Sequence, residues 1–131
     1  MLRIPSPLPD EIETLVHRTI GCCIAVHRGL GPGLLESTCF RAVCIELHAA
    51  GVPFEAEKQI PVMYRGQLLC HHRLDLVVAN SVVVEIKSVE RFAPVHHAQL
   101  LNYLRVSGLR VGLLVNFNLP TLQEGIKRIV L

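Results

Sequence analysis

Three stretches of the chain repeat hydrophobic residues every three or four positions, which predicts helices with one apolar face. The first should begin near Pro9, with Asp10 as N-cap and Glu13 completing a capping box. Its apolar stripe consists of Ile12, Val16, Ile20 and Ile24. A segment rich in glycine and proline at 29–33 should end it. A second helix is predicted over 34–50, and a third follows Pro94 and ends near residue 107.

Alternating hydrophobic and polar residues, together with runs rich in Val, Leu and Ile, predict strands in the rest of the chain. The predicted strands are 59–64, 68–78, 82–87, 111–115 and 126–131. The order ααβββαβ, with one more strand at the end, predicts an α/β fold in which a mixed central sheet is flanked by helices. We expect one domain over 1–131, with residues 1–9 as an irregular N-terminal arm.

Two of these strands, 68–78 and 82–87, should form a hairpin around the three-residue loop 79–81. Alternation then places six apolar side chains on one face: Leu74, Leu76, Val78, Val82, Val84 and Ile86. Four charged side chains fall on the other face: Arg73, Asp75, Glu85 and Lys87. The hairpin therefore separates an apolar core face from a charged face.

A three-residue loop sets Asp75 opposite Glu85 and Arg73 opposite Lys87. Like charges that face each other across a sheet repel by roughly 0.2–1 kcal/mol when exposed. A divalent cation between the carboxylates, with a phosphate drawn to the two cationic side chains, would relieve both repulsions. The alternative is an ordinary solvated face whose charges exchange partners.

Glu36 shares one line of the second predicted helix with Phe40, Val43 and Leu47. Because the other three are core residues, Glu36 should point toward the interior or an adjoining cleft. A buried carboxylate must be paired, protonated or bound to metal. Alternatively, Glu36 is a first-turn acid that the helix dipole favours at the margin of the apolar face.

The third predicted helix carries Gln99 and Tyr103 four residues apart, so both should project to one side, near His96. Both side chains can donate hydrogen bonds to phosphates or bases. The alternative is a core tyrosine beside a surface glutamine.

The 131 residues are 50% hydrophobic and 18% charged with a net charge of +2, which suits a compact domain and permits a polyanionic partner. No apolar run approaches the length of a membrane span, and no signal peptide is recognisable. Five cysteines without a Cys-x-x-Cys pair favour reduced thiols and a cytoplasmic location. The segment 70–72, Cys-His-His, could suggest zinc, but a zinc site needs correctly spaced ligands from elsewhere in the chain.

Together, Arg73-x-Asp75, Glu85-x-Lys87 and Gln99-x-x-x-Tyr103 resemble the PD-(D/E)xK nuclease superfamily, in particular its RecB-type and lambda-exonuclease-type branch. From about residue 13 to the end, the chain also resembles the GxxExxY proteins, a small prokaryotic family within that superfamily. The similar segments are 20–21, 26–28, 30–37, 61–66, 98–101, 113–117 and 125–130. Two positions depart from the pattern: Cys39 stands where the family has Tyr, and Leu74 stands where the superfamily has Pro.

The resemblance implies a restriction-endonuclease-like core and Mg²⁺, with Mn²⁺ as a substitute, held by Asp75, Glu85, Glu36 and the backbone carbonyl of Ile86. It implies that Lys87 acts on the attacking water. The residues implied to contact nucleic acid are Arg73, Gln99, Tyr103 and His96. The expected function is a metal-dependent nuclease acting on DNA in preference to RNA. A homodimer or a partner protein would supply specificity, and a catalytically weak module that binds nucleic acid or protein is the alternative.

Overall fold

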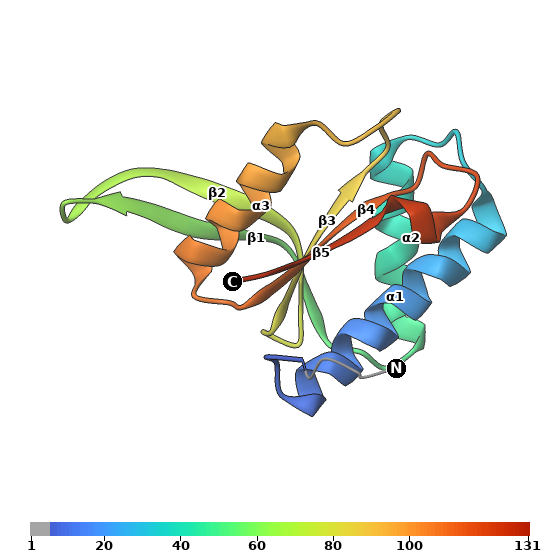
Figure 1. Cartoon of the computed structure of the whole chain (residues 1–131), viewed down its shortest axis with the longest axis horizontal. Helices are drawn as coiled ribbons and strands as arrows, with labels where there is room; N and C mark the ends of the chain where they lie inside the picture. Colours follow the sequence, from blue (N-terminus) through green and yellow to red (C-terminus); the bar gives the residue numbers. More distant parts are fainter. Residues whose placement is uncertain (1–5) are drawn as a thin grey trace.

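The computed structural model describes residues 6–131, and this part of the chain forms three α-helices, five strands and a short 3₁₀ helix (Figure 1). The helices are α1 (Asp10–Leu30), α2 (Glu36–Ala49), α3 (Pro94–Ser107) and η1 (Leu122–Gly125). The strands are β1 (Phe54–Tyr64), β2 (Gln67–Val78), β3 (Val82–Lys87), β4 (Val111–Asn116) and β5 (Ile126–Val130). The predicted order of elements is confirmed.

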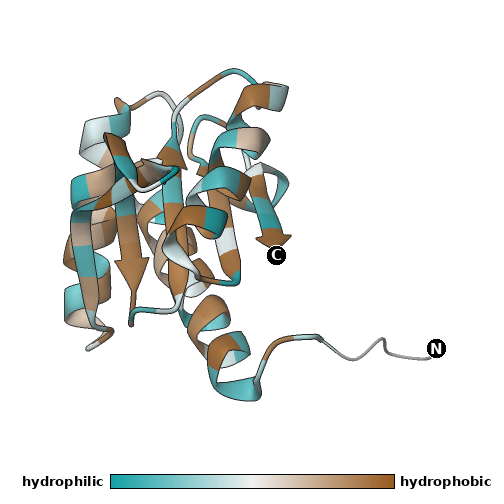
Figure 2. Ribbon diagram, turned by 90° about the vertical axis from the view of Figure 1, so that its left-hand side faces the viewer, coloured by the Kyte–Doolittle hydropathy of each residue, from teal (hydrophilic) through white to brown (hydrophobic). Residues whose placement is uncertain are grey.

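The five strands form one mixed sheet in the order β1-β2-β3-β4-β5, in which only the β3–β4 pair is parallel. Hydrophobic residues concentrate on the central strands, between the helical layers (Figure 2). One core cluster lies between this sheet and helices α1 and α2, and a smaller cluster lies under α3 on the opposite face. Both faces of the sheet are therefore covered, as expected for an α/β fold.

Helix α3 can pack closely on the sheet because β4 has a glycine beneath it. A Cβ atom at Gly112 would lie 2.8 Å from Cδ1 of Leu100, so a larger residue would push the helix away. Gly108 ends α3 in the left-handed conformation, with φ of 75°, where glycine avoids the strain of a side chain.

The predicted capping box of the first helix is wrong. Pro9 occupies the N-cap position and no side chain caps the helix. The carboxylate of Glu13 instead accepts hydrogen bonds from Ser6 and from Arg128 of β5. An ion pair between Glu13 of α1 and Arg128 of β5 thus replaces the predicted capping contact within the helix.

Several predicted boundaries also shift. Helix α2 begins at Glu36 rather than at residue 34, because Leu35 is extended and serves as N-cap. Strand β1 begins at Phe54, five residues earlier than predicted, and pairs there with Val78 of β2. The first residues of β1 are mostly exposed and include charged side chains, so they lack the alternation of apolar and polar residues that predicts a strand. They form a strand because they pair with β2.

Of the predicted N-terminal arm, residues 1–5 lie outside the described part of the chain, and residues 6–9 are irregular. Leu8 is nevertheless buried, and Arg110 donates a hydrogen bond to the carbonyl of Pro7. No helix within residues 6–131 is long and apolar enough to span a membrane.

Candidate functional site

The site is built where β2 and β3 separate. The register Val78↔Val82 confirms the three-residue loop, but the ladder ends at Leu76↔Val84. The next pair in this register is Asp75 with Glu85, and these side chains replace the missing ladder bonds. The backbone N–H of Asp75 donates to Oε1 of Glu85 at 3.1 Å, and the N–H of Ile86 donates to Oδ2 of Asp75 at 2.8 Å. Both carboxylates thus lie in the gap between the strands.

A sharp distortion of the sheet explains this gap. Leu76 packs in the core beneath α1 and α2, whereas Leu74 packs in the cluster under α3 on the opposite face. The prediction that these two residues share a face is therefore wrong. On the neighbouring strand, Glu57 has φ of 54° and is not paired with Asp75, although the residues on either side are in register. Positive φ is rare for a residue other than glycine and concentrates at functional sites.

A pocket of about 340 Å³ opens at this distortion. It is lined by Glu36, Ser37, Phe40, Glu57, Arg73, Asp75, Glu85, Lys87, Gln99 and Tyr103. The elements α2, β1, β2, β3 and α3 all contribute to it. Seven of the eight side chains predicted for the site line this pocket, and His96 is the exception.

Glu85 has the most strongly perturbed environment in the pocket. Its side chain is buried, with 4% of the residue exposed. Burial, followed by the negative charge of Asp75, raises the pKa of Glu85 to about 8, although Lys87 opposes the shift. Without a cation, this environment therefore favours the protonated form of the carboxyl group.

The backbone of Ile86 offers a further oxygen at the same place. The N–H and C=O of one strand residue point to the same edge of the strand. Because the N–H of Ile86 reaches Asp75, its carbonyl also points toward the gap. The neighbouring carbonyl of Lys87 points the other way and accepts a hydrogen bond from Phe117 at 2.9 Å.

Glu36 is the first residue of α2 and lies exposed at the mouth of the pocket. Glu36 thus lies beside a cleft, as the first prediction for this residue stated. It also lies in the first turn of a helix, as the alternative prediction stated. Within residues 6–131 no group of three or more His, Cys, Asp or Glu side chains is arranged to hold one metal ion. The side-chain ligands available together in this arrangement are those of Asp75 and Glu85.

Tyr103 is a core residue that reaches the pocket. It is 7% exposed and packs on the ring of His72, with centroids 4.9 Å apart. Burial, then the charges of Glu85 and Asp75, raise the pKa of its phenol. Gln99 is exposed on the pocket side of the same helix. Both halves of the predicted pair therefore border the pocket.

Two predicted contacts differ in the structure. His96 does not line the pocket, because its Nδ1 accepts the N–H of Ala93 at 3.0 Å and so caps α3. Arg73 does not face Lys87 in a ladder pair, since the β2–β3 ladder ends before it. Its guanidinium instead forms an ion pair with Glu57 at 2.8 Å. The predicted repulsion between two cations is thus replaced by an attraction that the sequence did not suggest.

The family model described as the PD-(D/E)XK nuclease superfamily matches residues 13–129. The chain belongs to the PD-(D/E)XK nuclease superfamily. Searches of curated proteins and of solved structures found no match. Nucleases of this superfamily generally use divalent metal ions, and two carboxylates beside a carbonyl oxygen are ligands that hard divalent cations prefer.

The segment after Lys87 is fixed by a buried asparagine, Asn116, that sequence reasoning passed over. Asn116 accepts hydrogen bonds from the N–H groups of Val89 and Asn118, both at 3.1 Å, and donates to the carbonyl of Val89 at 2.8 Å. Ser88 donates to the carbonyl of Leu34, just before α2. These bonds tie the end of β3 to β4 and to the start of α2. Among the pocket residues, Glu57 and Ser37 were also missed. Glu57 lies outside every segment that resembles the family, and Ser37 ends one of these segments without having been assigned a role.

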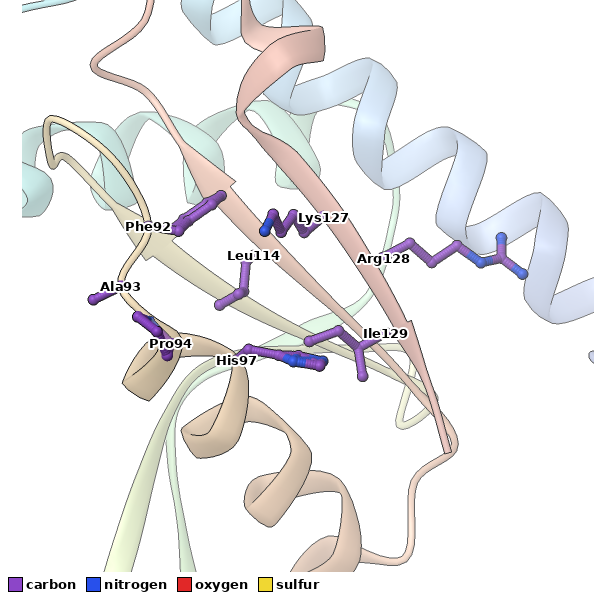
Figure 3. A pocket seen from close by; sticks show the side chains of 8 residues that line it. All are labelled: Phe92, Ala93, Pro94, His97, Leu114, Lys127, Arg128 and Ile129. Atoms are coloured by element: carbon purple, nitrogen blue, oxygen red, sulfur yellow. The ribbon is translucent and has the colours of Figure 1, made fainter.

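A larger cavity of about 550 Å³ lies between α3 and β5 (Figure 3). Its lining contains no carboxylate. Its polar lining includes His97 and Lys127, and the ammonium of Lys127 lies 5.8 Å from the ring centre of Phe92. Arg128 points away from this cavity, toward α1 (Figure 3). The two neighbouring carboxylates, Asp75 and Glu85, line the smaller pocket instead.

Proposed function

We propose that this protein is a Mg²⁺-dependent nuclease that hydrolyses phosphodiester bonds in DNA in preference to RNA. The observation that carries the proposal is the pair Asp75 and Glu85, held together in the gap between β2 and β3. Protein interiors rarely place two carboxylates so close unless a proton or a cation lies between them. Membership of a nuclease superfamily supplies the reaction class.

Asp75, Glu85 and the carbonyl of Ile86 would hold the metal ion, with Glu36 binding the ion or its waters from the mouth of the pocket. When bound, Mg²⁺ would lower the pKa of a water molecule that it holds and would place positive charge beside the scissile phosphate. Mn²⁺ would substitute, since it accepts similar oxygen ligands. The raised pKa of Glu85 fits this assignment, because a divalent cation would favour the ionised carboxylate that burial disfavours.

Lys87 is half-buried in the pocket, next to Glu85 along β3. Its ammonium would orient the attacking water and stabilise the negative charge that develops on the phosphate oxygens. The hydrogen bonds of Asn116 fix the backbone that follows Lys87. This reduces the freedom of the lysine before substrate arrives.

Arg73, Gln99 and Tyr103 would position the nucleic-acid backbone, since all three border the pocket and can donate hydrogen bonds. Arg73 is held by Glu57 in the absence of substrate. A phosphate would compete with Glu57 for the guanidinium, whose planar donors suit phosphate oxygens. His96 is omitted from this set because it caps α3.

We further place the chain in the GxxExxY family and the RecB-type and lambda-exonuclease-type branch, on the motifs quoted above. Cys39, which replaces the family's tyrosine, is 1% exposed and does not line the pocket. The substitution therefore falls in the core beneath α2. This supports retained activity. Selection of substrate would fall to a homodimer or a partner protein.

A binding module without catalysis is the second candidate. The observation that favours it is that residues 6–131 bring together no three metal-ligating side chains. One experiment separates the two candidates: labelled single-stranded, double-stranded and branched substrates are incubated with Mg²⁺, Mn²⁺ or EDTA. A nuclease cleaves at least one substrate and only with metal. Binding of a substrate without cleavage in either metal supports the binding module.

A further inference from the structure

Strands β1 and β2 continue well beyond the sheet. β2 pairs with β3 only through residues 76–78, so residues 58–64 and 67–74 form a two-stranded ribbon that extends past the body of the protein (Figure 1). Helix α3 supports the base of the ribbon, where His72 Nε2 lies 2.8 Å from Oδ1 of Asn102. The ribbon ends in a two-residue turn in which Arg65 has φ of 50° and Gly66 has φ of 78°. Positive φ at both positions is typical of the tight hairpin turn that matches strand twist.

The end of this ribbon is unusually hydrophobic for an exposed surface. Four large apolar residues gather there: Met63, Tyr64, Leu68 and Leu69, which are 54%, 63%, 54% and 62% exposed. They are four of the nine exposed large hydrophobic residues within 6–131. A gathering of this kind marks a binding surface. Moreover, a two-stranded ribbon gains little stability by itself in water.

Charge along the ribbon and α3 is one-sided. No aspartate or glutamate occurs between Lys58 and Arg73, nor between Arg91 and Arg110. Arg65 is exposed at the ribbon turn, and Arg105 is exposed on α3. Four of the seven histidines of the chain also lie on these two elements. Lys58 and Arg73 pair with Glu55 and Glu57 of β1, so Arg65 and Arg105 give this surface its excess of positive charge, which suits a polyanion.

We infer that the ribbon lies in a groove of double-stranded DNA that is bound at the carboxylate pocket. The inference rests on the proposed nuclease function and specifies its substrate as a duplex. The major groove of B-form DNA, about 12 Å wide, admits a two-stranded ribbon, whereas the major groove of an RNA duplex is too narrow to be read. Arg65 contacts the phosphate backbone, and the apolar end contacts base edges and thymine methyl groups.

The dimensions of the ribbon agree with this placement. The eight residue-to-residue steps from Gln67 to Asp75 span roughly 26 Å along the strand. This length corresponds to about eight base pairs at about 3.4 Å each. The ribbon would therefore engage the duplex within one helical turn of the scissile phosphate, while Arg73 and Gln99 contact the backbone at the pocket.

The test measures the affinity of the protein for a labelled 20-base-pair DNA duplex, the matching single strand and the matching RNA duplex, in EDTA to prevent cleavage. Two ribbon variants are compared, Met63→Ser/Leu69→Ser and Arg65→Glu. Their matched controls are Ile45→Ser, an exposed hydrophobic residue on α2, and Arg41→Glu, an exposed arginine on α2. Since the substituted side chains are exposed, all four variants should melt at the same temperature as the wild-type protein. If the serine double variant fails to fold, Arg65→Ala carries the test.

Both ribbon variants should bind the DNA duplex at least tenfold more weakly than wild type, and both controls should stay within about twofold. Arg65→Ala should lower the slope of log affinity against log salt by about one, as expected for one lost phosphate contact. Ribbon variants that bind the duplex like wild type overturn the inference. The inference is also overturned if sedimentation shows that the wild-type protein is a dimer and the ribbon variants are monomers. The apolar end of the ribbon would then join two copies of the chain. Failure of the wild-type protein to bind any of the three nucleic acids contradicts the proposed function itself.

Discussion

The buried carboxyl group of Glu85 should make the metal-free protein lose stability as the pH rises. Its pKa is about 8 in the folded protein against 4.5 for an ordinary glutamate. Between these values the folded state holds a proton that the unfolded state has released, so unfolding becomes easier as the pH increases. The slope is about 1.4 kcal/mol per pH unit, and the loss between pH 5 and pH 8 is on the order of 4 kcal/mol.

Urea denaturation in EDTA at pH 5, 6, 7 and 8 measures this loss, and Glu85→Gln is the matched variant. Glutamine keeps the oxygen that accepts the N–H of Asp75 but carries no charge. Wild type and Glu85→Gln should be about equally stable at pH 5, and the variant should be more stable by several kcal/mol at pH 8. The seven histidines are common to both proteins, so their titration cancels in the difference.

Asp75 and Lys87 are the charged groups that act on this carboxyl group, in opposite directions. Asp75→Asn should reduce the dependence on pH without abolishing it, because burial is the larger cause of the shift. A difference between wild type and Glu85→Gln that stays constant from pH 5 to pH 8 would refute the reasoning. A difference of opposite sign would mean that the carboxylate is stabilised in its ionised form without metal.

Three further substitutions test other parts of the account. Glu36→Gln should keep the fold and weaken Mg²⁺ binding in calorimetric titration; unchanged affinity would leave Glu36 as a helix-start acid. Gln99→Ala should weaken nucleic-acid binding in fluorescence anisotropy and leave metal affinity alone, because its side chain is exposed; loss of folding would assign it to the core instead. Asn116→Ala should cost about 1–3 kcal/mol in urea denaturation, because the polar backbone groups of Val89 lose their partner, and equal stability would contradict the role assigned to it.

The hairpin could be predicted closely because its pattern is local. Alternation and loop length fix which residues of β2 and β3 face each other, and the register Val78↔Val82 follows directly. Strand β3 was predicted with its exact bounds. The juxtaposition of Asp75 and Glu85 follows from the same register, so the centre of the pocket was accessible from sequence.

The departures arise where distant segments decide the outcome. Leu74 changes face because the ribbon twists away from the sheet at Asp75, and strict alternation does not describe such a twist. Glu57 pairs with Arg73 because β1 extends further than its own sequence suggests. Asn116 gains its importance from a loop 27 residues earlier in the chain. Contacts of this kind depend on tertiary packing.

The sequence also could not show which residues of a helical line are buried and which lie exposed at the end of the helix. One helical line joins Glu36, Phe40 and Val43, yet exposure rises along it from the buried Val43 to the exposed Glu36. His96 lies near Gln99 on α3 but bonds to the backbone of its own helix start. Periodicity predicts the direction in which a side chain points but not the groups that it contacts.

The central claim is that Asp75 holds the catalytic metal and Lys87 acts on the water that attacks the phosphate. The most direct measurement is cleavage of a labelled DNA duplex at saturating Mg²⁺, with melting temperature recorded on the same samples. Wild type should cleave and should gain about 2.7 kcal/mol at a hundredfold excess of metal over Kd. Lys87→Ala should keep this stabilisation and lose cleavage, while Asp75→Asn should lose both. Cleavage by Asp75→Asn at the wild-type rate would contradict the account.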